Sequence, residues 1–573
     1  MSGDSLVFEM SNQTESVPSI FLKKDSLAIL DNQNSNYQGG QVVIDTSQLS
    51  NSNKYMNYRE AYLTMPLLLT LSATAGVAFA PATAASSADY ALGLKNWYGS
   101  IIHSLTLDYM GTTIIQQTPL CGIWNSFKLM TTLSYQDILS QGAEIGFYPD
   151  NATAWSYSTA ATSSGIGACN NDNSGDTPVV TGALANGDKS NEGFTKRQQY
   201  WNFDLAALTR AGTGLAYSTL ISTSGMNNLW KSYIFNKING VGGDTPTAGV
   251  FQVAITAIVK LKHLHSFFER MPLLKGVFFK LTLTLNQTSV SFSSAGAGGV
   301  LTLNSVDSPV GGVSPLQLAS AAAGCGSVAA FPVGAYIASL SVGAVCNNAN
   351  QVSLAGGLIQ QSPLGRSVLL NVPAYSFNPV YETAYLSSPI KTVNYEDIYQ
   401  YSVTNTIGAG GTFNQLITNG IANIKQILVV PYYSAASNGG IAPILSPFEG
   451  SGAGTTSPLV HFNNFNIQVS GQNLIYNSVR YEYEAFVNQL YGTNAVNSGE
   501  TDGMTSGLIG LKEFSNEYCY YYANAGRMLP VEEAVPKSVN IIGTNQSLKA
   551  IDLYIFISYG VTVSIDSLTG ARV

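Results

Sequence analysis

The feature that most restricts the fold of this chain is a pattern that it carries twice. Residues 104–115 read SLTLDYMGTTII, and residues 464–475, at an offset of 360, read NFNIQVSGQNLI. Few residues are identical, but the apolar side chains and the glycine recur at the same places. Apolar and polar residues alternate on both sides of the glycine. This predicts a β-hairpin with Gly111 or Gly471 in its turn, because glycine adopts a positive φ without strain.

Each hairpin pattern is followed, at nearly the same distance, by apolar residues with helical spacing. They are Ile123, Trp124, Phe127 and Met130 after the first hairpin, and Tyr483, Phe486, Val487 and Leu490 after the second. Upstream of the hairpins, residues 61–66 resemble residues 426–431, and both segments end in proline. A strand, a hairpin and a helix at nearly one offset indicate two copies of one β domain.

Strand patterns dominate the rest of the chain. Apolar residues alternate with polar ones in 251–259, 279–285 and 551–557. Period-two alternation places one set of side chains on a single sheet face, which favours antiparallel sheets with one wet face. One further short helix is expected around 265–270, ending before Pro272. We therefore predict an all-β chain of antiparallel β-sandwiches with short helices and long loop insertions.

Two stretches rich in small and polar residues look like insertions, at about 150–192 and 295–365. The segment 308–365 has no charged residue, but small residues and prolines dominate it, so it predicts a loop-rich insertion rather than a membrane helix. Residues 1–40 are polar and lack periodicity, which predicts an extended arm. The predicted organisation is thus an arm over 1–40, a first domain with both insertions over 41–385, and a second domain over 386–573.

The charge content restricts the possible partners. Charged residues make up 10% of the chain, where about 25% is usual, and the net charge is −8. The most basic stretch, 260–265, is short and interleaved with apolar residues, so direct nucleic-acid binding is not expected. A neutral, turn-rich β protein of this kind is expected to bury surface against copies of itself.

Cysteines and the first residues of the chain indicate an intracellular protein. The five cysteines are odd in number and form no CxxC pair, so reduced thiols are expected rather than disulfides or a zinc site. The N-terminal residues lack a basic segment followed by an apolar one, so they do not predict a secretory signal.

Partial motifs for chemistry are present, but none is complete. Residues 182–190 resemble a phosphate loop, except that Asp188 stands where the motif needs lysine. His263 and His265, with Glu269 nearby, fall short of the three or four ligands that zinc needs, and we expect a surface pair beside a helix. No GxSxG or HExxH motif occurs.

Two further groups could in principle bind or cleave sugars. The acidic pairs 396–397 and 532–533 are expected to be solvated rather than to act as glycosidase carboxylates. The tyrosine-rich run 518–522 could stack on sugar rings, but it favours a strand packed on its neighbours. We therefore expect no catalytic, cofactor or metal site and no enzymatic activity.

Several segments resemble one known family. They are GRSVLLNVPAYSFNPVYE (365–382), AYLSSPIKTVNYEDIY (384–399), YALGLKNWYGSIIH (90–103) and FFERMPLLKG (267–276). These segments are similar to the double jelly-roll major capsid proteins of polinton-like viruses, which are related to the capsid proteins of virophages and large DNA viruses. The resemblance extends over most of the chain from about residue 55, but not over the two insertions.

The resemblance implies two consecutive jelly rolls, homotrimers with a pseudo-hexagonal outline, and an icosahedral shell around double-stranded DNA. It implies as partners the neighbouring capsomers and the penton and minor capsid proteins of the same virus. It places the protein in the virion, assembled inside the host cell, and leaves open whether a membrane lies inside the shell. The alternative is a two-domain β-sandwich binding module, such as a lectin-like adhesin.

Overall fold

The second half of the chain forms a sandwich with the strand order of a jelly roll. The computed structural model describes residues 19–73, 91–149, 250–294, 301–319, 333–343 and 367–573, apart from short gaps, together with Asp4 and four short strands at 168–169, 232–236, 353–354 and 358–359. The two four-stranded sheets of the second sandwich have the orders β19-β26-β21-β24 and β20-β25-β22-β23. With the strands lettered B to I along the chain, these orders are B-I-D-G and C-H-E-F, the arrangement of a jelly roll. The strands are β19 (Ile390–Ile407), β20 (Thr412–Ile421), β21 (Ile424–Tyr433), β22 (Phe462–Val469), β23 (Gln472–Asn473), β24 (Tyr521–Asn524), β25 (Lys537–Asn545) and β26 (Ile551–Asp566).

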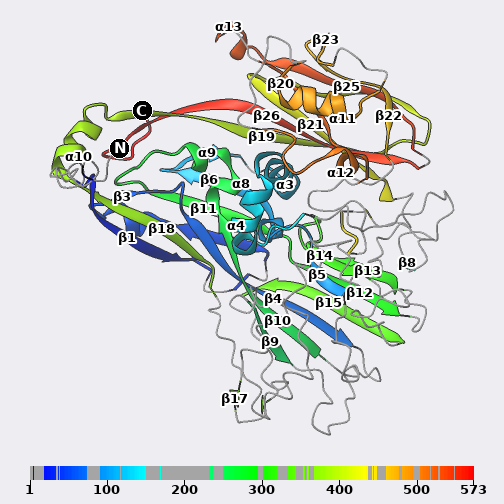
Figure 1. Cartoon of the computed structure of the whole chain (residues 1–573), viewed down its shortest axis with the longest axis horizontal. Helices are drawn as coiled ribbons and strands as arrows, with labels where there is room; N and C mark the ends of the chain where they lie inside the picture. The colour runs from blue at the N-terminus through cyan, green and yellow to red at the C-terminus, as the bar shows by residue number, and fades with distance from the viewer. Residues whose placement is uncertain are drawn as a thin grey trace.

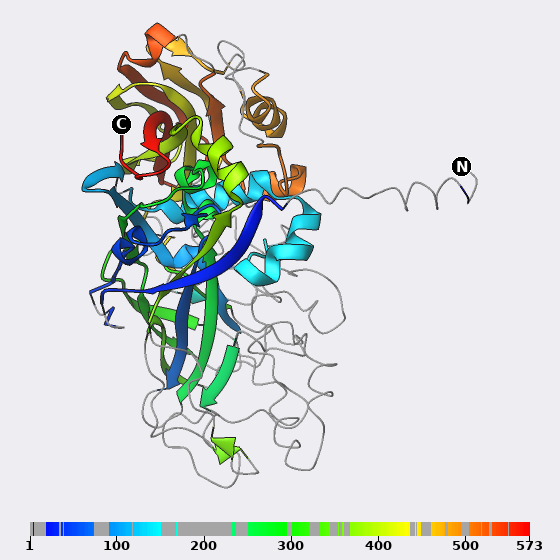
Figure 2. The same ribbon diagram turned by 90° about the vertical axis from the view of Figure 1, so that its left-hand side faces the viewer.

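The first half of the chain repeats this order. One sheet runs β2-β11-β6-β7, which corresponds to C-H-E-F. In the other sheet β1, β18, β4 and β10 are neighbours in that order, which corresponds to B-I-D-G. The two sandwiches occupy separate parts of the molecule (Figures 1 and 2). The strands are β1 (Phe21–Leu30), β2 (Gln41–Asp45), β4 (Tyr62–Ala73), β6 (Ile102–Tyr109), β7 (Thr112–Ile115), β10 (Val250–Lys260), β11 (Phe279–Leu285) and β18 (Leu369–Phe377).

The predicted all-β double jelly roll is therefore confirmed, and so is the duplication. The hairpin β6–β7 turns through Met110 and Gly111, with φ of 47° and 83°. The hairpin β22–β23 turns through Ser470 and Gly471, with φ of 50° and 80°. Two consecutive positive φ values are typical of the two-residue turns whose twist matches that of paired strands.

The helices expected from apolar spacing are also present. Helix α3 (Cys121–Thr132) and helix α11 (Tyr483–Leu490) both lie between strands F and G of their sandwiches. Helix α9 (Ser266–Arg270) ends before Pro272, as expected. Further helices are α4 (Tyr135–Ile145), α8 (Leu261–Leu264), α10 (Pro379–Leu386), α12 (Leu511–Asn516) and α13 (Pro530–Glu533).

The prediction of an arm over residues 1–40 is wrong for its second half. Residues 21–30 form strand β1, which pairs with β18 from Phe21↔Phe377 to Leu30↔Leu369. The burial pattern explains the error, because only Ile29 is fully buried and most of the outward positions are exposed. An edge strand of this kind shows weak alternation in the sequence. Residues 1–18, apart from Asp4, lie outside the described residues.

The second insertion is not loop-rich throughout, because it contains strands. Strands β13 (Leu301–Asp307) and β15 (Gly334–Val342) of the insertion form, with β12 (Thr288–Ser294) just before it, a sheet that continues the first sandwich, and β14 (Leu316–Ala319) pairs with β5 (Ala91–Leu94). The insertion 150–192 lies outside the described residues except for Ala168–Cys169. Among the described residues, no helix is long and apolar enough to cross a membrane.

The insertion joins the first sandwich through a change of partner along strand β4. Thr64 and the two residues before it pair with β18, whereas Leu67–Ala73 pair with β15. Pro66 lies at the changeover, and its carbonyl accepts a hydrogen bond from Gly343 N at 2.9 Å. Proline has no N–H to donate, and this is tolerated at Pro66 because the pairing of β4 on this edge is interrupted there. On its other edge β4 pairs with β10 along its whole length, without a register shift.

The topology places the long connections of the first sandwich at one end. Consecutive strands of a jelly roll run in opposite directions, so the D–E, F–G and H–I connections share an end and the C–D, E–F and G–H connections share the other. Residues 74–101, 116–249 and 286–368 make the first set of connections. These connections therefore leave and rejoin the first sandwich at one end, which we call the insertion end.

Candidate functional site at the junction of the two sandwiches

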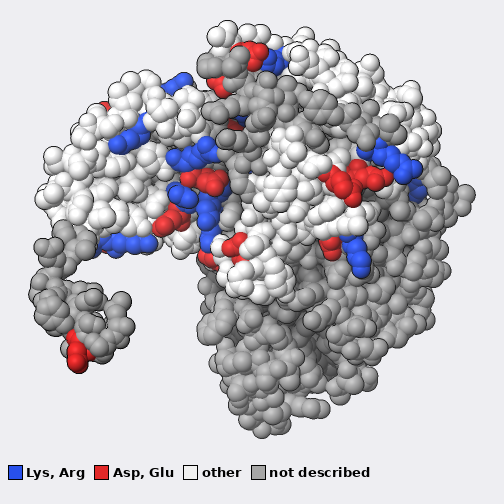
Figure 3. Space-filling model, turned by 45° about the horizontal axis from the view of Figure 1, so that its top comes forward, with Lys and Arg blue, Asp and Glu red and all other residues white. Residues whose placement is uncertain are grey.

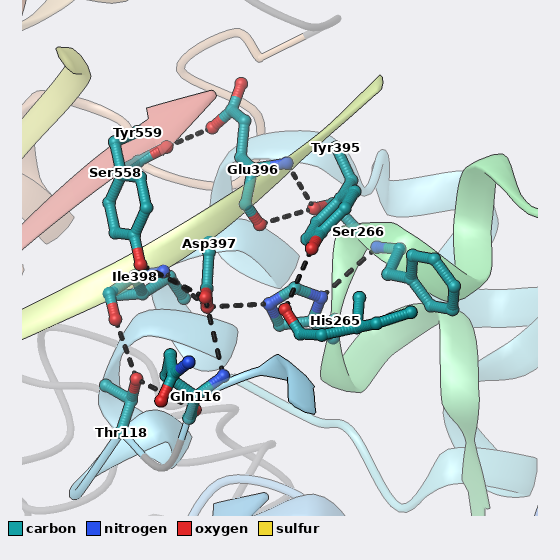
Figure 4. A network of polar contacts seen from close by, with 12 residues as sticks. Gln116, Thr118, His265, Ser266, Tyr395, Glu396, Asp397, Ile398, Ser558 and Tyr559 are labelled. Carbon is teal, nitrogen blue, oxygen red and sulfur yellow. Dashed lines mark hydrogen bonds and ion pairs between the residues drawn. The ribbon is translucent and has the colours of Figure 1, made fainter. Parts of the chain in front are cut away.

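A buried polar network joins the two sandwiches (Figure 4). His265 lies in the G–H connection of the first sandwich, and Asp397 lies in strand β19 of the second. His265 Nε2 is 3.3 Å from Asp397 Oδ1, and the two residues are 7% and 2% exposed. His265 Nδ1 accepts a hydrogen bond from Phe267 N at 3.2 Å, so the imidazole hydrogen lies on Nε2 and is donated to the carboxylate.

Besides His265, Asp397 collects donors from three further segments. Its Oδ1 also accepts from Ile398 N at 2.9 Å, and its Oδ2 accepts from Tyr559 Oη at 3.1 Å and from Gln116 N at 3.4 Å. Burial, followed by the charge of Asp397, raises the pKa of Tyr559, so its phenol keeps the hydrogen that it donates. A buried carboxylate is stable when hydrogen-bond donors surround it in this way.

Main-chain contacts align the same two segments. Ser266 Oγ donates to Glu396 O at 2.7 Å and accepts from Glu396 N at 2.9 Å. Thr118 Oγ1 donates to Ile398 O at 2.7 Å. Strand β19 thus carries, over three consecutive residues, contacts to two connections of the first sandwich.

Aromatic packing forms the apolar part of the junction. Helix α3 of the first sandwich lies against strands of the second: Phe127 is 5.1 Å from Tyr520 and 5.6 Å from Tyr522 between ring centroids, and Trp124 is 6.5 Å from Phe556. Figure 1 shows α3 between the two sandwiches. All five rings are buried. The sandwiches therefore share one continuous core.

The C-terminus and the insertion end add three further contacts. Tyr109 Oη donates to Gly570 O at 2.8 Å, and Lys275 N donates to Ser567 O at 3.1 Å, so the last residues of the chain return to the first sandwich. Near the insertion, the buried Lys95 donates through Nζ to Ser446 O at 2.6 Å. Contacts along this length fix the relative orientation of the sandwiches.

The junction has the residue types of a hydrolytic triad but not the geometry. Ser266 Oγ bonds to the main chain of Glu396, and both nitrogens of His265 are used by Phe267 N and Asp397. Among the residues that the structure describes, no hydroxyl is therefore placed to lose its proton to this imidazole, which nucleophilic catalysis requires. The arrangement holds two domains together, and it offers no activated nucleophile.

The sequence-based expectations for these residues need correction. His263 and His265 are not a surface pair: His265 is buried, it caps helix α9, and His263 makes a ring contact with the buried Trp97. Asp397 is not solvated but is among the most buried polar residues of the second sandwich. The burial of Asp397 was predictable from the sequence. Val393, Tyr395 and Asp397 alternate along one strand, so their side chains point to the same, buried face of the sheet.

Glu533, from the other acidic pair, lines one pocket with Tyr395 and Glu396 of the junction. Glu533 pairs with Lys425 at 3.4 Å, and Asp397 has no such lysine partner among the described residues. In the described part of the chain, no three His, Cys, Asp or Glu side chains come together as a metal site would require. Residues 182–190 lie outside the described residues.

The tyrosine run and two of the cysteines are core residues. Tyr520, Tyr521 and Tyr522 are each at most 1% exposed, so these packed rings offer no sugar-stacking surface, and the predicted strand is confirmed for Tyr521 and Tyr522, which lie in β24. Cys121 and Cys519 are buried free thiols, and burial raises the pKa of each to about 12.

Comparisons with known proteins return similar structures only. No family model matches the chain, and no curated protein matches it. A chain in the cryo-EM structure of the Sputnik virophage is 12% identical, with a TM-score of 0.48, over 98% of this chain and 90% of that one. The mavirus major capsid protein is 10% identical, with a TM-score of 0.46, over 98% and 91%. The Faustovirus major capsid protein is 9% identical, with a TM-score of 0.42, over 96% and 91%.

Proposed function

We propose that this chain is a structural subunit of a viral shell, a major capsid protein that assembles as a homotrimer. The observation that carries the proposal is the presence of two jelly rolls of one strand order in a single chain, fixed to each other by a continuous core. Jelly rolls are a common architecture of viral shells. Three such chains around a threefold axis place six similar sandwiches in a ring, which gives a pseudo-hexagonal block.

The surface of the chain is suited to repeated contacts with copies of itself. Only 10% of the residues are charged, and on the face shown in Figure 3 the described charged side chains form small groups among uncharged residues. Obligate interfaces bury about 2,000–5,000 Å² or more, and neutral polar and apolar groups suit such burial. Closed rings need contacts between unlike faces of neighbouring subunits, which two similar but non-identical sandwiches supply.

The placement of the insertion fits a subunit with two distinct ends. All long connections of the first sandwich leave from the insertion end, whereas the E–F hairpins lie at the opposite end. In the proposed shell the insertion end faces outward and the hairpin end faces the enclosed DNA. The protein is then located in the virion, its partners are neighbouring capsomers and the penton and minor capsid proteins, and it has no enzymatic activity.

The test is the oligomeric state and shape of the full-length purified protein. Light scattering should give three times the mass of the 60.7 kDa chain, and negative-stain images should show a hexagonal outline. A second variant, Asp397→Ala, should blur the outline because its junction is loosened. A stable monomer that binds glycans would contradict the proposal and favour the adhesin-like module.

A further inference from the structure

The junction is built from elements that the duplication also supplies a second time. Helix α3, from the F–G connection of the first sandwich, packs on the B-I-D-G sheet of the second. Its Trp124 meets Phe556 of strand I, and its Phe127 meets Tyr522 of strand G. The second sandwich has its own F–G helix, α11, and the first sandwich has its own B-I-D-G sheet. Both counterparts keep exposed residues in the single chain.

Strand pairing identifies the counterpart of the surface that α3 covers. In the second sandwich, the row of directly paired residues that contains Phe556 and Tyr522 crosses the four strands as Gln400, Phe556, Leu428 and Tyr522. In the first sandwich, the corresponding row is Leu30, Leu369, Thr64 and Ile258, which we call the outer row. The two rows correspond because Ile258 lies two residues before the end of β10, and Tyr522 lies two residues before the end of β24.

The outer row faces away from the core of the first sandwich. Leu63 and Val259, which precede and follow Thr64 and Ile258 along their strands, are fully buried. Successive side chains of a strand point to opposite faces of the sheet, so Thr64 and Ile258 lie on the other face. Leu30 is 62% exposed, and the other three residues of the row are half-buried. The row therefore carries apolar side chains, at three of its four positions, on the outside of the sandwich.

Helix α11 presents the counterpart of the α3 surface. It follows its hairpin as α3 does, and at the offset of 360 Val487 occupies the place of Phe127 and Glu484 that of Trp124. Val487 is half-buried and Glu484 is exposed. Tyr491, directly after the helix, is 55% exposed. The side of α11 that corresponds to the junction side of α3 is thus open to solvent.

Helix α12 extends this open surface. Phe514 of α12 packs on Phe486 of α11, with 5.0 Å between the ring centroids, and Figure 1 shows both helices on the second sandwich. Leu511, the first residue of α12, is 59% exposed. Exposed apolar side chains that lie together indicate a site of interaction. We call the surface formed by Val487, Tyr491 and Leu511 the helix surface.

We propose that the helix surface of one subunit covers the outer row of a second copy of this chain. The inference rests on the homotrimer proposed above. A closed ring of six sandwiches contains six places where one sandwich meets the next. Three of these places lie inside the chains, where α3 covers the second sandwich. The other three lie between chains, and the duplication assigns them to α11 and the B-I-D-G sheet of the first sandwich.

The contacts inside the chain also indicate which residues meet between chains. Phe127 and Tyr522 are 5.6 Å apart between ring centroids, so their counterparts Val487 and Ile258 should meet across the subunit boundary. Glu484 stands where the first sandwich has an aromatic side chain. The contact between chains is therefore smaller and more polar than the one inside the chain, and a single charge placed in it should have a measurable effect.

Light scattering of the full-length protein over a range of concentrations tests the proposal. Val487→Asp and Leu30→Asp each place an unpaired charge in the expected contact, where its burial is unfavourable. The concentration at which half of the chains are trimeric should rise at least tenfold in each variant. The matched control Leu416→Asp places the same charge at a leucine of β20 that is 56% exposed, in the other sheet of the second sandwich, and should match the unmutated protein.

Chemical cross-linking tests the expected pair with substitutions that add no charge. A chain with both Val487→Cys and Ile258→Cys, treated with a short bismaleimide, should give covalently linked trimers on a denaturing gel. Each single cysteine variant should give no more linkage than the unmutated protein. A trimeric unmutated protein whose Val487→Asp and Leu30→Asp variants behave like Leu416→Asp would overturn this inference and leave the homotrimer standing, as would a double cysteine variant that links no more than the single ones. A monomeric unmutated protein would overturn both.

Discussion

His265 Nε2 lies 3.3 Å from Asp397 Oδ1, and 131 residues separate the two in the sequence. The contact joins the first sandwich to the second in a place that water does not reach, since the two side chains are 5% and 3% exposed. The strength of this connection depends on the surrounding donors more than on the pair itself, because a buried carboxylate without them would be unstable.

Replacing Asp397 with alanine should destabilise the protein strongly. The change leaves His265 Nε2–H and the Tyr559 hydroxyl without an acceptor, so we expect the free energy of unfolding to fall by about 3 kcal/mol or more. Denaturant unfolding measures the change. Glu482→Gln, at an exposed glutamate of the same sandwich, is the control and should have little effect. A loss as small as that of the control would show that the junction does not depend on this network.

Acidification should destabilise the native state through His263. Burial and two neighbouring lysines lower its pKa to about 3 from the ordinary value of 6.5. The unfolded chain then binds more protons than the folded one between these values, so stability is full above pH 6.5 and falls as the pH drops. The contribution has a limiting slope of about 1.4 kcal/mol per pH unit.

The measurement for His263 is unfolding by denaturant at pH 7 and pH 5. His263→Gln removes the titrating group and should reduce the loss of stability between the two pH values. His103 and His461 have pKa values lowered by burial as well, so the loss should shrink rather than vanish. If His263→Gln loses as much stability between pH 7 and pH 5 as the unchanged protein does, the pH dependence does not come from His263.

The duplicated turn glycines should be equally sensitive to substitution. Gly111 and Gly471 have φ of 83° and 80°, and no atom lies within 4 Å of an added Cβ at either position. Alanine therefore adds only backbone strain, which costs about 1–2 kcal/mol at a left-handed position. Gly420→Ala is the control, because its surroundings are equally open and its φ is not positive. Different losses at Gly111 and Gly471 would show that the two hairpins are not equivalent.

Deletion of strand β1 should cost far more than deletion of the residues before it. A chain starting at Ser19 keeps β1, whereas a chain starting at Asp31 loses the edge strand and exposes β18 along nine paired positions. We expect the longer deletion to unfold at a lower temperature and to aggregate, because an unpaired edge recruits other strands. Similar midpoints for the two deletions would support the original interpretation of the whole segment as an arm.

Local patterns predicted the elements whose apolar residues keep one period. The alternation in 279–285 became β11, and the helical spacing around Phe127 became α3. Strands β12, β13 and β15 were missed because serine, alanine and glycine dominate their surroundings and hide the period. Asp397 was misjudged because the alternation of β19, which places it inward with Val393 and Tyr395, does not show the donors from remote segments that stabilise a buried charge.

Strand β4 gives the insertion a mechanical property that a tethered loop would lack. The ladder between β4 and β10 runs from Tyr62↔Lys260 to Ser72↔Val250 without a register shift, and it passes from the sandwich into the insertion. A load on the tip of the insertion is therefore carried along these strands in shear, with many hydrogen bonds sharing it at once. Force applied to the sheet of β12, β13 and β15 therefore reaches the core of the first sandwich through paired strands.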